Sequence, residues 1–218
     1  MIVAGHQADL FPYSGFWFKM AHSDIFDIKI YDQFQARGYQ RRVLMRGAWA
    51  SVPIAGGSRQ CRIRDIRIDP VKARDALCAN VQGRYRGSRH WRRHGDRVLA
   101  MIEETNSDLL WHLNFTLILG IRDLLGITTP VGIAPPVVGR GSTGLISMLR
   151  NYGATTYLSG QGGRAYMGDC HEFDEAGIDV VWSDHRAVTS DSVLTILMDY
   201  DDPLGVILGT SDSVRTSA

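Results

Sequence analysis

The sequence has no apolar run that approaches the ~20 residues of a membrane-spanning helix. Its N-terminus also lacks the basic-then-apolar pattern of a signal peptide, so we expect a cytoplasmic protein with no membrane contact. Cysteine is scarce: Cys61, Cys78 and Cys170 are an odd number, widely spaced, and no CxxC pair occurs. These spacings indicate neither a disulfide framework nor a zinc site built on thiolates.

Motifs of several enzyme classes are also missing. The sequence has no GxSxG nucleophile elbow and no cysteine with the local signature of a nucleophile. Among possible metal ligands, His90 and His94 lie in a field of arginines that would oppose a cation, and Cys170-His171 has no companion ligands. We therefore expect neither a metal nor a cofactor.

Acidic side chains are scarce in one long segment. From Arg37 to Arg97 the chain has fifteen Arg and one Lys against four Asp and no Glu, a net charge of +12. Residues 1–36 carry −2 and residues 98–218 carry −9. Because arginine suits bidentate contacts with phosphate, this segment favours a polyanionic partner such as nucleic acid, a nucleotide or a pyrophosphate. Alternatively, the segment pairs with the acidic C-terminal half.

The periodicity of the N-terminus indicates an α/β fold. Residues 2–5 read as a buried strand, residues 14–22 as a helix with an aromatic face, and residues 25–31 as an alternating strand. A strand–helix–strand unit of about 30 residues is typical of a parallel pair. With 218 residues, of which 44% are hydrophobic, the chain is long enough for one sizeable core.

We expect a single α/β domain over residues 1–208, with a mostly parallel sheet flanked by helices and a polar tail at 209–218. A basic hairpin and helical insertion is expected within it at residues 37–97. Its elements are a hairpin over 42–54 that turns near Arg46-Gly47, an alternating strand over 62–68, and a helix that Asp69-Pro70 starts and that ends near residue 82. The other expected elements are helices at 98–104, 107–125, 144–151 and 172–177, and strands at 155–158 and 178–182. Residues 130–138 are expected to form a short strand broken by two prolines, and residues 192–208 a final helix followed by a loop or short helix.

Polar residues stop the first predicted strand. His6 and Gln7 stand where ligands bind in open α/β sheets, beyond the carboxyl ends of strands. A histidine there can act as a general base with nearly its intrinsic pKa, although a lone histidine is more often structural. Lys19, the only cation on its helix, either snorkels to solvent or points into the site. Asp32 completes the candidate catalytic set.

A glycine-rich stretch, SGQGG, follows the predicted strand at 155–158. Successive glycines let backbone N–H groups converge on an anion, and the N-terminus of a following helix adds its dipole. The stretch itself is neither GxGxxG nor a Walker loop, and a purely structural turn is the alternative. The candidate phosphate-binding residues here are Ser159, Gly160, Gln161, Gly162, Gly163 and Tyr166.

Two arginine-rich stretches are further candidates. RGYQRR, residues 37–42, is either a phosphate clamp or a solvated loop. RYRGSRHWRRH, residues 84–94, interleaves arginines with aromatic residues as nucleic-acid surfaces do, or merely covers a sheet. The candidates are Tyr13, Arg37, Gln40, Arg41 and Arg42 for substrate or phosphate, and Arg84, Arg86, Arg89, Trp91, Arg92 and Arg93 for nucleic acid.

Several of these segments together resemble the WbqC-like protein family. The stretch HQADLFPYSGFWFKMAHSDIF is similar to the opening of that family, and DQFQARGYQRR, WASVPI, TTYLSGQGGRAYM and EAGIDVVW follow in the family's order. The resemblance covers about residues 1–185. Two features depart from it: Ala8 stands where the family usually has Pro, and Val43-Leu44 follow Arg41-Arg42 where a longer polar run is usual.

The resemblance implies a setting in which a small amine or acyl group joins an acceptor that bears phosphate or pyrophosphate. One setting is surface-polysaccharide synthesis on nucleotide-linked sugars, and the other is phage modification of hydroxymethylated pyrimidine in DNA, which implies a host cytoplasm. We first expect a transferase that joins a glycine- or serine-like amino acid to a phosphorylated pyrimidine in DNA, with His6 as the base and Arg42 and the 159–163 loop on the departing anion. The alternatives are a nucleotide-linked sugar as acceptor and a non-catalytic binding subunit.

Overall fold

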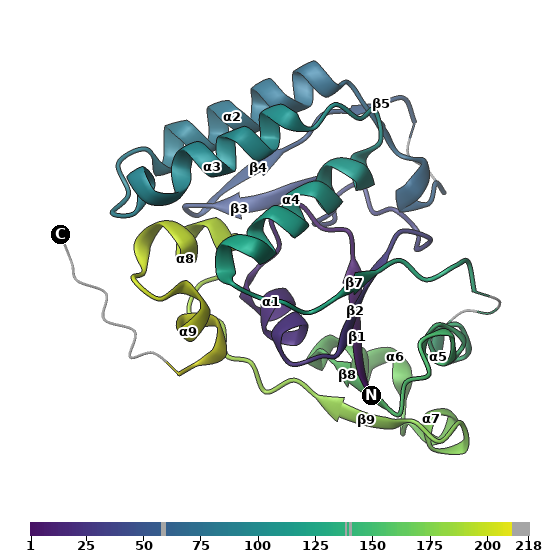
Figure 1. Cartoon of the computed structure of the whole chain (residues 1–218). Coiled ribbons are helices and arrows are strands. Elements are labelled where there is room, and N and C mark those ends of the chain that lie inside the picture. Colours follow the sequence, from purple (N-terminus) through teal and green to yellow (C-terminus); the bar gives the residue numbers. More distant parts are fainter. Residues whose placement is uncertain (58–59, 138, 140, 211–218) are drawn as a thin grey trace.

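The N-terminus forms the predicted strand–helix–strand unit in the computed structural model, which describes residues 1–57, 60–137, 139 and 141–210 (Figure 1). The unit consists of β1 (Ile2–Gln7), α1 (Ser14–Ala21) and β2 (Ile25–Lys29). The two strands are parallel, and Gln7 lies opposite Lys29. Because parallel strands end at the same edge of a sheet, the polar residues that close β1 and β2 lie side by side.

The central sheet has five strands in the order β7-β2-β1-β8-β9, each parallel to its neighbours. The later strands are β7 (Val131–Gly132), β8 (Thr156–Ser159) and β9 (Asp179–Trp182). The chain runs from β1 outward to β2 and β7, then crosses back to β8 and β9 on the other side. The strand order therefore reverses between β1 and β8, and such a switch point opens a crevice at the carboxyl ends of the strands.

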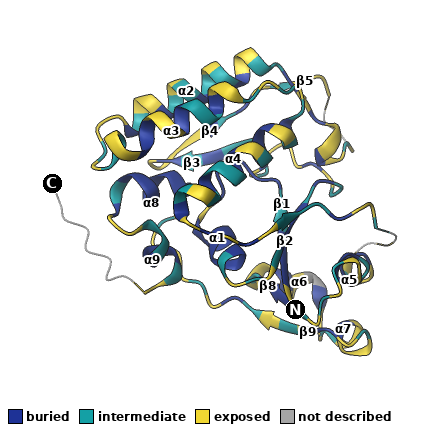
Figure 2. Cartoon of the chain, in the orientation of Figure 1, coloured by how far each residue is buried: buried dark blue, intermediate teal, exposed yellow. Residues whose placement is uncertain are grey.

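Hydrophobic residues cover both faces of this sheet (Figure 2). Ala4 packs in the cluster that contains the aromatic residues of α1, whereas its neighbour Val3 packs in the cluster that contains Leu149. Neighbouring residues of β1 thus face opposite sides, as the pleat of a strand requires. The second face is covered by α5 (Gly141–Asn151) and α7 (His171–Glu175), so the predicted α/β fold with a parallel sheet flanked by helices is confirmed.

The segment between β2 and β7 opens with the predicted hairpin, made of β3 (Arg42–Met45) and β4 (Ala48–Ser51). Its turn lies at Arg46 and Gly47, whose φ angles are 54° and 73°. Two successive positive φ angles define the type I′ turn, whose twist matches that of the flanking strands.

The rest of this insertion is largely helical, with α2 (Pro70–Tyr85), α3 (Trp91–Glu104) and α4 (Leu110–Leu125) packed in series (Figure 1). Asp69 caps α2 as predicted, because its carboxylate accepts hydrogen bonds of 3.0 and 3.1 Å from two backbone N–H groups of the first turn. Since α3 packs against α4, the basic insertion extends beyond residue 97 and shares the main core.

One expectation for a single strand is wrong. Residues 62–68 form a 3₁₀ turn, η1 (Ile63–Asp65), and only a short strand, β6 (Arg67–Ile68), which pairs with β5 (Ile54–Ala55). The turn lets Ile63 and Ile66, three residues apart, both be buried, which a straight strand would prevent. The short strand expected at 130–138 is β7, and the prolines that follow it cannot donate to a ladder, as predicted. Residue 138 lies outside the described residues.

Residues 192–208 form two short helices, α8 (Val193–Asp199) and α9 (Pro203–Leu208), in agreement with the predicted final helix followed by a loop or short helix. The Ser192 hydroxyl caps α8 by accepting a 3.1 Å hydrogen bond from the backbone of Leu194. Residues 211–218 of the predicted tail lie outside the described residues. Among the helices of the described ranges, none is long and apolar enough to cross a membrane.

One buried polar residue of α4 holds two loops in place. Asn114 is fully buried, and its side-chain amide donates hydrogen bonds of 2.7 Å to the backbone carbonyls of Ala8 and Gln40. The loop that follows β1 and the loop that precedes β3 are therefore tied to the same point of the core.

We expect Asn114→Ala to lower the free energy of unfolding by ~2–4 kcal/mol, because two buried carbonyls lose a donor. Urea unfolding at pH 7 measures this change. Thr116→Ala, an exposed position on the same helix, should shift it by less than about 0.5 kcal/mol. Equal effects of the two substitutions would contradict the bridging role of Asn114.

Candidate active site

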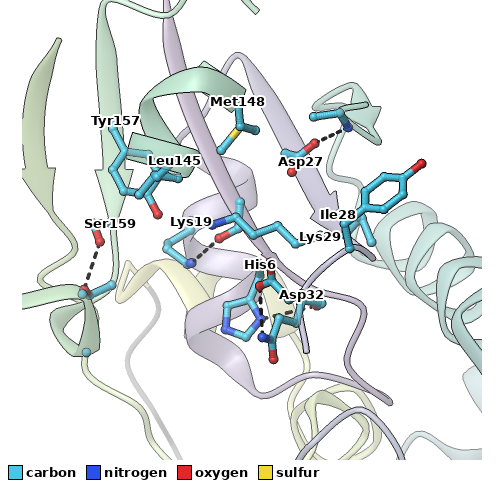
Figure 3. A pocket seen from close by; sticks show the side chains of 18 of the residues that line it. His6, Lys19, Asp27, Ile28, Lys29, Asp32, Leu145, Met148, Tyr157 and Ser159 are labelled. Carbon is cyan, nitrogen blue, oxygen red and sulfur yellow. Dashed lines mark hydrogen bonds between the residues drawn. The ribbon is translucent and has the colours of Figure 1, made fainter. Parts of the chain in front are cut away.

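A cleft of about 1320 Å³ opens at the carboxyl ends of β1, β2 and β8, where the strand order reverses (Figure 3). It brings together residues that are far apart in the sequence and that the sequence analysis singled out. The predicted residues that line it are His6, Gln7, Tyr13, Lys19, Asp32, Ser159, Gly160, Gln161, Gly162 and Gly163.

Lys19 points into the cleft and does not snorkel to solvent (Figure 3). Only 5% of its surface is exposed, and its Nζ donates a 3.0 Å hydrogen bond to the backbone carbonyl of Gly5 beneath the end of β1. Burial, together with the nearby positive charge of Lys29, lowers the pKa of Lys19 to about 7. The amine is therefore partly neutral at physiological pH, which is rare for lysine.

His6 and Asp9 lie next to this lysine. The Nδ1 atom of His6 is 3.3 Å from a carboxylate oxygen of Asp9 and 3.4 Å from the backbone carbonyl of Gln7. Burial and the charge of Lys19 lower the pKa of His6 to about 3, and burial raises the pKa of Asp9 to about 7. The expectation of a nearly intrinsic pKa for His6 is wrong, because the imidazolium would be desolvated beside a cation.

A chain of amides and a carboxylate orders the polar floor of the cleft. Gln7 donates a 3.0 Å hydrogen bond from Nε2 to Asp32, and its Oε1 accepts one from Nε2 of Gln40. Gln40 is 2% exposed and lies behind Gln7, outside the cleft wall. Gln40 therefore orients Gln7, and the carboxylate of Asp32 remains at the cleft surface.

The glycines of the 159–163 loop differ in why glycine occupies each position. A Cβ on Gly163 would lie 2.3 Å from the Ser159 hydroxyl, so packing requires glycine there. At Gly160 and Gly162 an added Cβ would meet no atom within 4 Å and φ is not positive, so neither packing nor backbone geometry requires glycine. Both line the cleft, and their missing side chains leave the backbone open to a ligand.

The loop runs through a 3₁₀ turn, η2 (Gln161–Gly163), into α6 (Arg164–Met167). Because α6 has four residues, the helix dipole expected to assist an anion at this loop is small. The Tyr166 side chain lies outside the described part of the chain.

A second glycine-rich stretch, GRGSTG at residues 139–144, was not among the predicted site residues, although its GxGxxG spacing was a signal for it. Gly139, Gly141 and Gly144 line the cleft, the last two at the start of α5. Gly139 and Gly141 have φ angles of 104° and 60°, and a Cβ on Gly144 would lie 3.0 Å from the Gly139 carbonyl oxygen. All three positions therefore depend on glycine.

Other residues of the cleft carried weaker sequence signals. Asp27 accepts 2.7 Å hydrogen bonds from the backbone of Ala134 and from the Tyr152 hydroxyl, which holds the loop after β7 in place. Burial raises the pKa of Asp27 above its usual value. Lys29 was detectable from the parallel register, since it lies opposite Gln7, whereas no local pattern marked His185, whose Nε2 is 2.8 Å from the Ser14 hydroxyl.

The predicted arginine clamp lies outside the cleft wall as far as the residues are described. Arg37 is exposed, and Arg41 and Arg42 are half-buried. The guanidinium carbon of Arg42 lies 4.2 Å from the centroid of the Trp49 ring on the neighbouring strand of the hairpin. Of the RGYQRR segment, Gln40 alone is hydrogen-bonded to a cleft side chain among the contacts of the described residues.

The six candidates for nucleic-acid binding lie at the adjoining ends of α2 and α3, beside α8, and none lines the cleft among its described residues (Figure 1). Arg84 donates to backbone carbonyls of the hairpin, including a 3.1 Å bond to Trp49, and Arg89 pairs with Asp201 at 2.9 Å. Trp91 is half-buried against the main core. Four members, Arg86, Arg89, Arg92 and Arg93, are exposed, and their role on DNA stays a prediction.

Comparison with known proteins gives one match. The model of the WbqC-like protein family matches residues 7–190, which include all the polar cleft residues described above except His6. No curated protein and no solved structure matches the chain significantly. Within the described residues, no group of three or more His, Cys, Asp or Glu side chains is placed to hold a metal ion.

Lys19 should titrate near pH 7, which ¹³C NMR of labelled lysine can follow because the chain has three lysines, Lys19, Lys29 and Lys72. The Cε signal that disappears in Lys19→Met identifies the residue. The unfolded chain keeps the proton of the Lys19 ammonium up to about pH 10.5, whereas the folded chain releases it near pH 7. The free energy of unfolding should therefore rise with pH between these two values. This rise should be smaller in Lys19→Met. A Lys19 midpoint above pH 9 would refute the assignment.

Proposed function

The chain belongs to the WbqC-like protein family, which suggests a biosynthetic role in group transfer. On that premise we propose that it joins the amine of an amino acid to a phosphorylated acceptor. The leaving group is a nucleoside diphosphate when the acceptor is a nucleotide-linked sugar, and phosphate or pyrophosphate when it is a phosphorylated pyrimidine. The observation that supports this most is the buried Lys19, with a pKa of about 7, in one cleft with the open backbone at Gly160 and Gly162. A proton acceptor and an anion cradle are the two groups that such a reaction needs.

In the proposed reaction the amine nitrogen attacks the acceptor carbon that carries the phosphate oxygen. The new C–N bond forms as the C–O bond breaks, and the electron pair leaves on the phosphate oxygen. The proton that the amine loses passes to neutral Lys19. Lys19 takes the base role that we expected of His6, because an imidazole with a pKa of about 3 holds a proton too weakly near pH 7.

His6, Gln7 and Asp32 are then positioning groups for the amino acid. The Nδ1 atom of His6 faces Asp9 and the Gln7 carbonyl, so Nε2 is the nitrogen available to a ligand. The carboxylate of Asp32, held by Gln7, suits the ammonium form of the incoming amine before it loses its proton.

The departing anion is assigned to the glycine-rich side of the cleft. The backbone at Gly160 and Gly162 borders open space, and the GxGxxG stretch at the start of α5 lines the same cleft. Lys29 adds positive charge from the end of β2. Of the GxGxxG stretch, Gly139, Gly141 and Gly144 are the residues that line the cleft. Together with Lys29 and the 159–163 loop, they stabilise the charge that develops on the leaving oxygen.

The acceptor that the geometry supports best is a nucleotide-linked sugar, because the cleft suits a small molecule and the arginines at 84–93 lie elsewhere. A phosphorylated hydroxymethyl-pyrimidine in DNA, our first expectation, is the second candidate. It is favoured by the exposed Arg86, Arg92 and Arg93, which suit a phosphate backbone.

The double substitution Gly160→Ala with Gly162→Ala should raise the Kd for pyrophosphate about tenfold, roughly 1.4 kcal/mol, because two methyl groups would fill the anion cradle. Isothermal titration calorimetry measures the Kd. Stability should be unchanged, since the space at both positions is open. Gly83→Ala on α2, where the space is also open, serves as the matched control. An unchanged Kd in the double variant would remove the cradle from the proposal.

Lys19→Met should lower kcat for product formation from an amino acid and a nucleotide-linked sugar by about 100-fold or more. In the parent protein kcat should rise with pH up to about 7 and then level off, because neutral Lys19 accepts the proton, and this rise should vanish in the variant.

The triple substitution Arg86→Glu, Arg92→Glu and Arg93→Glu is the control, because it removes exposed charge without touching the cleft. It should leave transfer to a nucleotide-linked sugar unchanged. Transfer to a phosphorylated hydroxymethyl-pyrimidine in DNA that the parent performs and the triple variant loses would favour DNA as the acceptor. Full activity of Lys19→Met would favour a non-catalytic binding subunit.

A further inference from the structure

The exposed aromatic side chains of this protein gather beside the cleft. Across the described residues, the aromatic side chains in the exposed class are Tyr13, Tyr39 and Trp49, with 43%, 52% and 44% of their surface accessible. They come from the loop after β1, the connection before β3, and strand β4. Because large aromatic surfaces are usually buried, their clustering in one place marks a binding surface.

These three side chains are here called the aromatic ledge (Tyr13, Tyr39 and Trp49). The ring centroids of Tyr39 and Trp49 are 5.8 Å apart. The Tyr39 backbone is joined to the loop that carries Tyr13, because its carbonyl accepts a hydrogen bond from the backbone of Leu10. No local sequence pattern links these positions, so only the fold assembles the ledge.

The backbone beneath the ledge is fixed on all sides. Arg84 of α2 donates a 3.1 Å hydrogen bond to the Trp49 carbonyl, and the Tyr39 carbonyl accepts one of 2.9 Å from Leu10. A Cβ on residue 15 would lie 2.7 Å from the Tyr13 ring, so Gly15 makes room for that ring. A rigid surface loses little entropy when a ligand binds.

Positive charge accompanies the ledge. The Arg42 guanidinium lies over the Trp49 ring at 4.2 Å, and none of the described residues accepts a hydrogen bond from its buried Nε. The segment 37–42 also carries Arg37 and Arg41 and no acidic residue. Aromatic faces beside guanidinium groups match a nucleobase joined to phosphate, because bases stack on rings and arginine binds phosphate.

The ledge continues into the cleft. Tyr13 belongs to both, since it lines the cleft wall. Gln40, which follows Tyr39 in the chain, is hydrogen-bonded to Gln7 at the cleft floor. A ligand whose base lies on the ledge therefore places its phosphate end at the entrance of the cleft.

We propose that the aromatic ledge, with Arg42, binds the base of a phosphorylated nucleoside whose reactive end enters the cleft. The inference rests on the proposed function for the direction of the ligand and adds Tyr39 and Trp49 as residues that select it. A nucleotide-linked acceptor and a DNA strand both present this chemistry, so the test includes one probe for each.

Calorimetric titration of the full chain with uridine diphosphate tests the ledge. Tyr39→Leu and Trp49→Leu should each raise the Kd about tenfold, because each removes a stacking face. Tyr39→Phe and Trp49→Phe keep an aromatic face and should stay within about twofold. Val71→Ala, at an exposed apolar position on α2, is the control for a change of surface elsewhere.

Pyrophosphate and a short oligothymidylate are the companion probes. Tyr39→Leu should leave the Kd for pyrophosphate unchanged, because pyrophosphate has no base to stack. Tighter binding of uridine diphosphate than of the oligonucleotide identifies a nucleotide-linked acceptor, and tighter binding of the oligonucleotide identifies a DNA strand. Either result supports the ledge if the leucine variants weaken the binding of the preferred probe.

Two results would overturn the ledge: uridine diphosphate binding no tighter than pyrophosphate, or leucine variants that bind it as the parent does. The anion cleft of the proposed function would stand in either case if pyrophosphate binds. If uridine diphosphate binds in a way that depends on the ledge and pyrophosphate does not bind at all, the result supports the ledge and contradicts the anion cleft.

Discussion

β1 is hydrogen-bonded on both sides by parallel strands, β2 and β8, and the connections that follow β1 and β8 pass to opposite faces of the sheet. The cleft exists because these connections diverge. The same pairing brings the end of β1 level with the end of β2, so that Gln7 lies opposite Lys29. The side-by-side placement of Gln7 and Lys29 at this site depends on that register.

The electrostatics of the site follow from the burial of three ionisable side chains, Lys19, His6 and Asp9. Lys19 extends from α1 beneath the end of β1, where its ammonium has a carbonyl partner and little solvent. The penalty for a buried charge lowers the pKa of Lys19, and burial together with this lysine lowers the pKa of His6. Asp9 responds in the opposite sense, with a pKa that burial raises. Groups that titrate near neutrality in a cleft are typical of proton-transfer sites.

The insertion between β2 and β7 supplies side chains beside the cleft and a support for its loops, neither of which comes from the sheet. Its hairpin carries Trp49 and Arg42, and its α4 ties the loops at Ala8 and Gln40 to the core through Asn114. Part of its positive charge is used internally, since Arg84 supports the hairpin and Arg89 pairs with Asp201. A high local net charge is therefore an unreliable measure of the charge that a partner meets.

The sequence by itself determined the parallel α/β core, because alternating and helical apolar periods at residues 2–31 admit few other arrangements. It also determined that His6, Gln7 and the 159–163 loop share a sheet edge, since strand ends carry the ligand sites of such folds. The strand expected at 62–68 failed because buried isoleucines fit a 3₁₀ turn as well as a strand. Tertiary structure alone decided the depth at which Lys19 lies, the displacement of the pKa values around it and the meeting of Tyr13, Tyr39 and Trp49. Desolvation and long-range contacts are properties of the packed chain, so no local pattern encodes them.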